Sequence, residues 1–370
     1  MKDTAATALP AWINEERIRF GAFFLAVFSL APLAVTWRYV NLSDWSVFAA
    51  AGHHAGSATL LHPLHLSESF PYTPGAAWAF VPFNALSLAG GLFVNAAIML
   101  GCAAAAAAVA THVYRVSLPH AAALVFAWAP TMNAAVIGQN SPLGLLLALL
   151  TLLGLERGSV ALTGVSLGIL LYKPTYALPL IAVLVLRARW RELAIVAAIG
   201  LAWYALSAWA SGGDWLFGVA WSRSLHDWTV VDFPQNQEKA VSIPSLLMRA
   251  HLPFVPAMLV ATLTAVAFIP LLRRAPIVVA GSAACVIGLA VSPHAWGYDG
   301  VLILPTIFVI VERLRGTVRA AVVAGAYVLA ALLTLLPVLH FDSVALVVLG
   351  ALAWWAFADR SSFRSGELGT

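Results

Sequence analysis

The first group that could do chemistry is Asp44, a carboxylate that follows the first long apolar run of the chain. Trp37, Tyr39 and Trp45 surround it, a composition typical of the level where a membrane helix reaches the membrane surface. Partial burial there can tune a carboxylate to act as a general base. A helix N-cap is an equally good interpretation, because Ser43 or Asp44 could simply begin the helix that the small residues at 49–52 favour.

Lys173 is the second candidate, in the sequence GILLYKPT at 168–175 between two apolar half-spans. A charge at membrane depth is costly enough to indicate a function, and an ammonium there would suit a phosphate group. The alternative is a lysine at a helix end whose long side chain reaches the membrane surface.

Two polar segments add further candidates. GQNSP at 138–142 contains Gln139 and Asn140, which could donate hydrogen bonds to hydroxyl groups or could simply form a turn. SPHAWGYD at 292–299 combines an imidazole, an aromatic pair and a carboxylate in His294, Trp296, Tyr298 and Asp299, a set that suits sugar binding. The spacing from His294 to Asp299 is no metal-ligand signature, so we expect no metal and no other cofactor.

Composition sets the class of protein that must position these groups. Of 370 residues, 62% are hydrophobic and 10% charged, with a mean hydropathy of +0.90, which indicates an all-α polytopic membrane protein. The net charge of +4 is small for this length and the basic residues are scattered along the chain, so nucleic-acid binding has no support. Cys102 and Cys285 fall inside predicted helices, and we interpret them as inert packing residues.

Apolar runs predict about twelve crossings and three regions: a cytoplasmic segment 1–19, a membrane domain 20–358 and a cytoplasmic tail 359–370. Fifteen of the twenty Lys and Arg residues then lie on the side of the termini, which places both termini in the cytoplasm. The predicted crossings are 20–37, 90–113, 120–137, 141–155, 159–172, 175–186, 193–211, 254–272, 276–292, 300–312, 319–337 and 344–358.

The outer side holds most of the groups suited to acid/base chemistry, including eight of the ten histidines. Two outer segments, 38–89 and 212–253, are too long for simple turns and should carry short helices of their own. Within the first, the apolar stretch 76–88 is interrupted by Pro82, which predicts an interfacial or re-entrant helix.

Six of these segments, in this order, resemble glycosyltransferase family 87. They are DWSVFAAAG at 44–52, FPYTP at 70–74 leading to Val81 and Pro82, GQN at 138–140, LLYKP at 170–174, RWR at 189–191 and SPHAWGYD at 292–299. The resemblance covers roughly residues 20–315. The chain departs from the family at two places. Family members often have Tyr-Pro-Pro where this chain has Thr73 as the middle residue, and some mannosyltransferases have a histidine pair where this chain has Tyr298 and Asp299.

The resemblance implies a GT-C fold, a polyprenyl-phosphate sugar as donor and Asp44 as the catalytic base. We therefore expect an inverting transfer of mannose or another hexose or pentose to a glycan or lipid acceptor at the outer face of the cell membrane. His294 is the second catalytic candidate. The expected substrate-binding residues, with the donor phosphate near the basic ones, are Arg38, Tyr72, Gln139, Asn140, Lys173, Lys239, Trp296, Tyr298 and Asp299.

Two other functions remain open on the sequence. A transporter or flippase of a lipid-linked sugar would also use a broken helix with a buried lysine. A polysaccharide ligase or polymerase would more naturally carry paired arginines on an outer loop, whereas Arg223 and Arg249 are far apart.

Overall fold

The computed structural model describes residues 39–40, 43–62, 64, 70–313, 316–332 and 342–357, and within these ranges the protein is all-helical, as predicted. One isolated antiparallel bridge joins Ala240 to Trp296. The helices are α3 (Asp44–His54), η2 (Ala58–Leu61), η3 (Pro74–Ala85), α4 (Leu88–Tyr114), α5 (Leu118–Phe126), α6 (Ala129–Ile137), α7 (Ser141–Arg157), α8 (Val160–Leu170), α9 (Pro174–Leu186), α10 (Trp190–Ala210), α11 (Phe217–Asn236), η4 (Gln237–Lys239), α12 (Ile243–Arg249), α13 (Phe254–Ala267), α14 (Ile269–Arg274), α15 (Ile277–Val291), η5 (Gly297–Ile303), α16 (Leu304–Arg313), α17 (Gly316–Ala331) and α19 (Val344–Phe357).

Three helical stretches are long and apolar enough to cross a membrane: α4, α10 and the run Phe254–Arg274 formed by α13 and α14. They correspond to the predicted crossings 90–113, 193–211 and 254–272. The predicted crossing 120–137 is a pair, α5 and α6, bent by 61°. Shorter apolar helices include α7, α8, α9, α15 and α19. Such a set of helices is that of a multi-pass membrane protein.

The predicted crossing 300–312 is divided between two kinds of helix. The run 300–312 is not one α-helix, because the chain is a 3₁₀-helix in η5 as far as Ile303 and α-helical only from Leu304. The predicted crossing 20–37 lies outside the described residues, as do the end of 319–337 and the terminal regions 1–19 and 359–370.

Prolines set several helix starts. Pro119, Pro130, Pro142 and Pro174 all lie in the first turn of α5, α6, α7 and α9, where a missing backbone N–H costs nothing. Pro174 also excludes the helical conformation from the residue before it, so Lys173 has φ −123° and ψ 83°. The break between α8 and α9 therefore falls at Lys173, as the sequence predicts.

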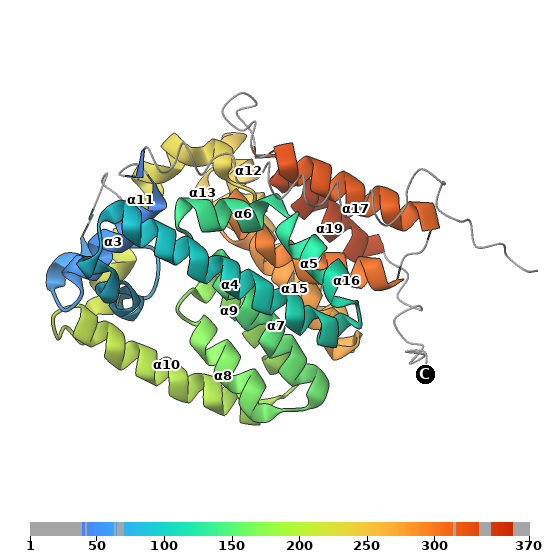
Figure 1. Ribbon diagram of the computed structural model, residues 1–370, viewed down its shortest axis with the longest axis horizontal. Coiled ribbons are helices and arrows are strands. Elements are labelled where there is room, and N and C mark those ends of the chain that lie inside the picture. Colours follow the sequence, from blue (N-terminus) through green and yellow to red (C-terminus); the bar gives the residue numbers. More distant parts are fainter. Residues whose placement is uncertain are drawn as a thin grey trace, which may run out of the picture.

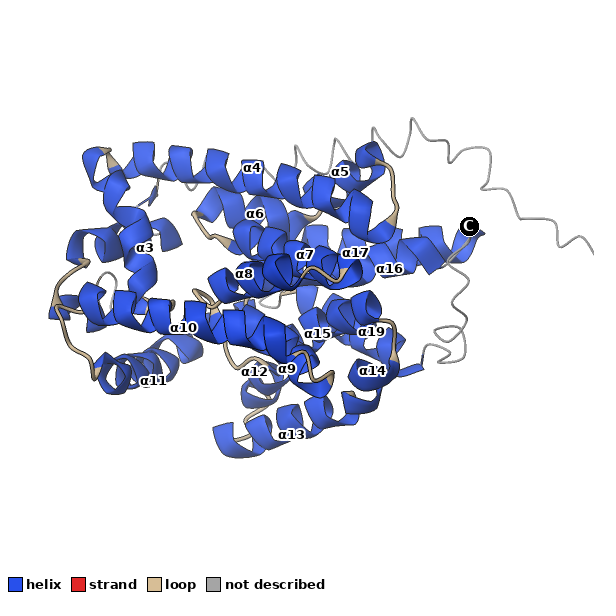
Figure 2. Ribbon diagram, turned by 90° about the horizontal axis from the view of Figure 1, so that it is seen from below, coloured by secondary structure: helices blue, strands red, loops and turns tan. Residues whose placement is uncertain are grey.

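The helices pack around α7 and α15 (Figures 1 and 2). α4 lies along one side and α13 along the opposite side, with α7, α9 and α15 between them. A buried face of small residues on α4, including Ala103, Ala106 and Ala107, allows close packing against α7. Of the two free cysteines, Cys285 is buried in α15 and Cys102 is half-buried in α4.

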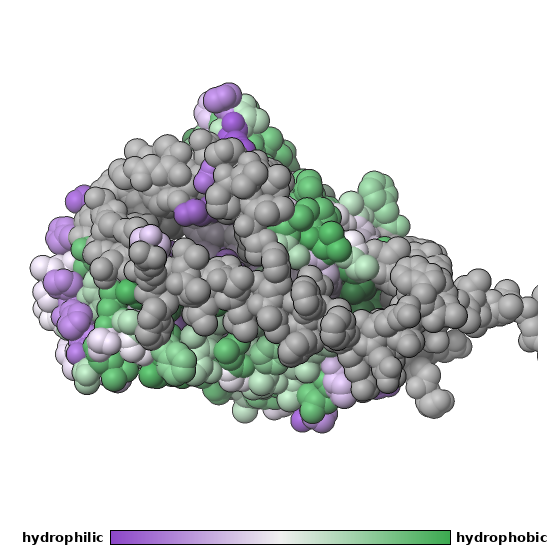
Figure 3. All heavy atoms as spheres, turned by 45° about the horizontal axis from the view of Figure 1, so that its top comes forward, coloured by the Kyte–Doolittle hydropathy of each residue, from purple (hydrophilic) through white to green (hydrophobic). Residues whose placement is uncertain are grey.

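Hydrophilic residues gather along one end of the bundle in Figure 3, with others at the top and the lower edge of the view, and hydrophobic residues cover much of the remaining described surface. α3 and α11 lie at this end, where α4 begins and α10 finishes (Figure 1). The two long segments predicted to carry their own helices do so, with α3, η2 and η3 in the first and α11, η4 and α12 in the second. In the stretch 76–88, η3 continues to Ala85 with Pro82 inside it, and α4 begins at Leu88.

Candidate active site

The polar turn at 138–140 begins at Gly138, whose backbone conformation only glycine adopts easily. Gly138 ends α6 in the left-handed region with φ +88°, and a Cβ there would lie 2.6 Å from Cβ of Trp45. Asn95 of α4 holds the turn by donating to the Gly138 carbonyl oxygen at 3.0 Å. The turn therefore packs closely on the start of α3, and its next residue, Gln139, faces Asp44.

Asp44 is hydrogen-bonded through its side chain to Gln139. Nε2 of Gln139 donates to Oδ2 of Asp44 at 2.6 Å, and the Tyr72 hydroxyl donates to Oε1 of Gln139 at 2.6 Å. Asp44 is the first residue of α3, and Ser43, the N-cap residue, makes no side-chain capping bond. The Asp44 carboxylate is thus turned toward a neighbouring segment, which favours the functional interpretation over that of a cap.

Burial is the main influence on the Asp44 carboxylate, which is half-buried. Loss of solvent raises its pKa above the ordinary value, and the nearby charge of Asp299 acts in the same direction. The hydrogen bond from Gln139 and the positive charges of Lys239 and Lys173 lower the pKa and offset part of that rise. A base tuned between these influences can take up a proton more readily than an exposed carboxylate.

Lys173 forms an ion pair in the interior. Its Nζ lies 2.6 Å from Oδ1 of Asp299, and its side chain is 9% exposed. The same ammonium lies over the rings of Tyr176 at 4.2 Å, Tyr72 at 5.5 Å and Tyr298 at 5.5 Å. Lys173 therefore does not reach for the surface as a lysine at a helix end would.

Asp299 accepts hydrogen bonds from several elements at once. Its Oδ1 also accepts from the Tyr176 hydroxyl at 2.6 Å and from the Ser141 hydroxyl at 3.3 Å, and its Oδ2 accepts from the Trp296 backbone N–H at 3.0 Å. This last bond closes the first turn of η5. Asp299 thus joins η5 to the start of α7 and to the α8–α9 break.

Lys239 brings a second positive charge close to Asp44. Its side chain is exposed, and its segment lies beside 294–298 through the Ala240–Trp296 bridge and a Val241 N–H bond to the Ala295 carbonyl at 3.0 Å. Its charge is close enough to favour the ionised form of Asp44. Arg38, the other basic candidate, lies outside the described residues.

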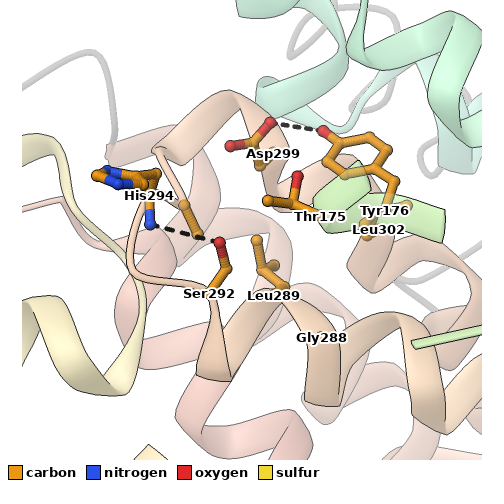
Figure 4. Close-up of a pocket in the computed structure, with 9 residues that line it drawn as sticks. Thr175, Tyr176, Gly288, Leu289, Ser292, His294, Asp299 and Leu302 are labelled. Atoms are coloured by element: carbon orange, nitrogen blue, oxygen red, sulfur yellow. Dashed lines mark hydrogen bonds between the residues drawn. The ribbon is translucent and has the colours of Figure 1, made fainter. Parts of the chain in front are cut away.

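His294 follows α15 at the edge of a small cavity (Figure 4). The cavity has a volume of about 10 Å³, roughly what one water molecule requires, and Tyr176, Ser292 and Asp299 also line it. The imidazole is turned away from Tyr176 and Asp299 (Figure 4). Burial lowers the pKa of His294 to about 4, so the ring is neutral at pH 7 and could act there by hydrogen bonding but not by charge.

Hydrogen bonds thus link Asp44 and Tyr72 to the turn at 138–141, and link that turn and the segment 173–176 to η5. A comparison with protein-family models matches the model for glycosyltransferase family 87 over residues 70–293, more than half of the chain. The chain belongs to glycosyltransferase family 87. The comparisons with curated proteins and with solved structures gave no match.

The family-87 match includes Tyr72, Gln139 and Lys173 but not every residue of the cluster. Asp44 precedes the matched range, and Trp296, Tyr298 and Asp299 follow it. Hydrogen bonds and ring contacts connect these outlying residues to the matched core, since Gln139 contacts Asp44 and Lys173 contacts Asp299.

The aromatic pair of this glycosyltransferase differs in exposure. Trp296 is 7% exposed and packs with Ala240 and Met248, so its face is covered, whereas Tyr298 is half-buried. Asn140 is buried before α7 and accepts from the Tyr172 hydroxyl at 3.2 Å through its backbone oxygen. In the structure as it stands, Tyr298 is the more accessible of the two rings.

Tyr176 and Ser141 belong to the cluster although they were not among the candidates. Tyr176 lies three residues after Lys173, so the first turn of α9 brings both side chains to the same face. That spacing is the signal in the sequence that could have revealed it. Among the described residues, no three His, Cys, Asp or Glu side chains gather into a metal-binding group.

Proposed function

We propose that this glycosyltransferase transfers a sugar from a polyprenyl-phosphate donor to a hydroxyl of a glycan or lipid acceptor, with inversion, at the outer face of the cell membrane. The fold would be a GT-C-type bundle of about twelve crossings with both termini in the cytoplasm. The sugar would be mannose or another hexose or pentose.

Asp44 would act as the general base. It would take the proton of the acceptor hydroxyl while that oxygen attacks the anomeric carbon from the side opposite the phosphate. The bond between the anomeric carbon and the phosphate oxygen breaks, and the polyprenyl phosphate leaves with the electron pair. The observation that carries this assignment is the hydrogen bond of 2.6 Å that Gln139 donates to Asp44, which holds the carboxylate in place. Burial raises the pKa of the same carboxylate and so makes it a stronger base.

Positive charges would stabilise the phosphate as it leaves. Lys239 is favoured for this role because it is exposed and its charge acts on Asp44, with Arg38 as a further candidate. Lys173 is already paired with Asp299, which offsets its charge, so it would contribute less to holding the phosphate than Lys239. The sugar and acceptor would contact Tyr298, Asn140 and His294 around this centre.

The lipid part of the donor would approach from the side, through the membrane. Support comes from the hydrophobic surface of α10 and α13, where Leu201, Val255 and Leu263 are exposed. A hydrocarbon chain can lie against such a surface without leaving the bilayer. The reacting phosphate would then meet the polar end of the bundle where α10 finishes.

A donor comparison tests this function. The purified protein in detergent is given an acceptor extract together with a polyprenyl-phosphate sugar or the corresponding nucleotide sugar. The proposal predicts glycosylated product only with the lipid-linked donor. Product from the nucleotide sugar alone would contradict the donor class, and donor translocation in vesicles without product would favour a transporter.

A further inference from the structure

Gln139 can adopt only one orientation between its two side-chain partners. A carboxylate such as that of Asp44 only accepts hydrogen bonds, so the NH₂ end of the Gln139 amide must face it. The carbonyl end then faces Tyr72, whose hydroxyl donates to it. The chain of donors runs in one direction, from Tyr72 through Gln139 to Asp44.

The parts of this chain are held by their surroundings. Gln139 and Tyr72 are each 3% exposed, so neither exchanges its partner for bulk water. The Gln139 N–H donates to the Ala134 carbonyl at 2.8 Å, which fixes its backbone. The Tyr72 ring stacks on Phe48 of α3 with centroids 5.3 Å apart and meets Tyr172 edge-on at 5.7 Å.

From this geometry we infer that Gln139 is a positioning residue that holds the Asp44 carboxylate toward the acceptor hydroxyl, and that Tyr72 fixes the orientation of Gln139. The inference rests on the proposed role of Asp44 as general base. The bond from Gln139 occupies Oδ2 of Asp44 and stops the carboxylate from rotating. Oδ1 accepts no hydrogen bond from the described part of the chain and is the oxygen that would take the proton.

The arrangement also affects the protonation of Asp44. A hydrogen bond donated to a carboxylate favours the ionised form, and here it opposes the effect of burial on the Asp44 pKa. Loss of the Gln139 amide should therefore raise the pH at which Asp44 becomes a competent base. A residue with a merely structural role would lower the rate equally at every pH.

The experiment compares pH–rate profiles of the purified enzyme with a polyprenyl-phosphate sugar as donor. Gln139→Met keeps the volume and removes the donor, so we expect kcat to fall about 10- to 100-fold and the acidic limb to move to higher pH. Gln139→Glu should move the limb further, because two adjacent carboxyl groups share a proton. Tyr72→Phe should shift it in the same direction, but less.

Tyr172→Phe is the matched control. It also removes one buried tyrosine hydroxyl, but that hydroxyl donates to Asn140 at 3.2 Å and not to Gln139. Its acidic limb should stay where the wild-type limb lies. An equal shift in Tyr172→Phe and Tyr72→Phe would contradict the role of Tyr72.

The outcomes separate this inference from the proposed function. If the acidic limb of Gln139→Met lies where the wild-type limb lies, or if its rate is lowered equally at all pH values, the positioning role of Gln139 is wrong. The proposed function would still stand in that case if Asp44→Asn is inactive. An active Asp44→Asn enzyme overturns the proposed function itself.

Discussion

Nζ of Lys173 lies 2.6 Å from Oδ1 of Asp299, although the two residues are 126 positions apart in the chain. The pair connects the break between α8 and α9 to the first turn of η5. Both side chains are buried, and Tyr176 and Ser141 donate to the same carboxylate oxygen. The two motifs that carry these residues are therefore parts of one structural unit.

Asp299→Asn should strongly destabilise the protein, because it leaves the Lys173 ammonium buried without its counter-charge. Breaking a buried pair on one side typically costs about 3–5 kcal/mol. Thermal unfolding in detergent measures the effect, with the exposed Asp214→Asn as the control. The double variant Lys173→Met/Asp299→Asn should lose less than the sum of the two single losses. Additive losses would show that the pair does not couple these segments.

Lys239→Gln should move the acidic limb of the pH–rate profile to higher pH. The base must be ionised, so the rate rises as pH passes through the Asp44 pKa, which burial already places above the ordinary value of about 3.9. Removing the nearby positive charge raises that pKa further. Added salt should shift the wild-type limb in the same direction, since Lys239 is exposed and screened, but should hardly shift the variant. A limb that moves to lower pH would contradict this electrostatic role.

Gly138→Ala and Gly158→Ala form a matched pair of substitutions. Both glycines have positive φ, +88° and +65°, so each alanine carries backbone strain of about 1 kcal/mol. Only at Gly138 would the new Cβ clash, 2.6 Å from Trp45, whereas nothing lies within 4 Å at Gly158. We expect Gly138→Ala to lose most transfer activity, because it displaces Gln139 from Asp44, and Gly158→Ala to keep most of it. Equal activity in the two purified variants would count against the turn's role.

Asp342→Asn should remove a pH dependence of stability. Burial raises the pKa of Asp342 to about 7, and its Oδ2 has no hydrogen-bond partner among the described residues. The folded state therefore keeps a proton that the unfolded state loses near pH 4, and stability falls as pH rises from about 4 to 7, by at most about 1.4 kcal/mol per unit. Melting temperatures at pH 5 and pH 8 should differ in the wild type more than in the variant. An equal difference in both proteins would rule out Asp342 as its source.

The helices and their breaks could be predicted because they depend on local signals. Hydropathy located α4 and α10, and the Lys173-Pro174 step located the break between α8 and α9. The extent of η5 could not be predicted in this way. Its 3₁₀ turn depends on the Asp299 carboxylate accepting from the Trp296 N–H and on Gly300 packing against Pro130, which is distant in the chain.

The residues of the site could be named, but their partners could not. Lys173 suggested a phosphate ligand because a buried charge needs a reason, and the sequence does not reveal that Asp299 neutralises it. Trp296 and Tyr298 suggested sugar binding, and the sequence does not reveal that Trp296 packs with Ala240 and Met248. Tertiary contacts decide both cases, and these pairings span distances in the chain over which local patterns carry no information.

Sugar transfer by Asp44→Asn shows whether Asp44 is the general base. The purified variant and the wild type are assayed with a panel of polyprenyl-phosphate hexoses and pentoses, and melting temperatures confirm that both are folded. Asparagine keeps the shape of the side chain but cannot accept the proton, so we expect a loss of about 10²- to 10⁴-fold in kcat. Transfer by Asp44→Asn at the wild-type rate would contradict this role.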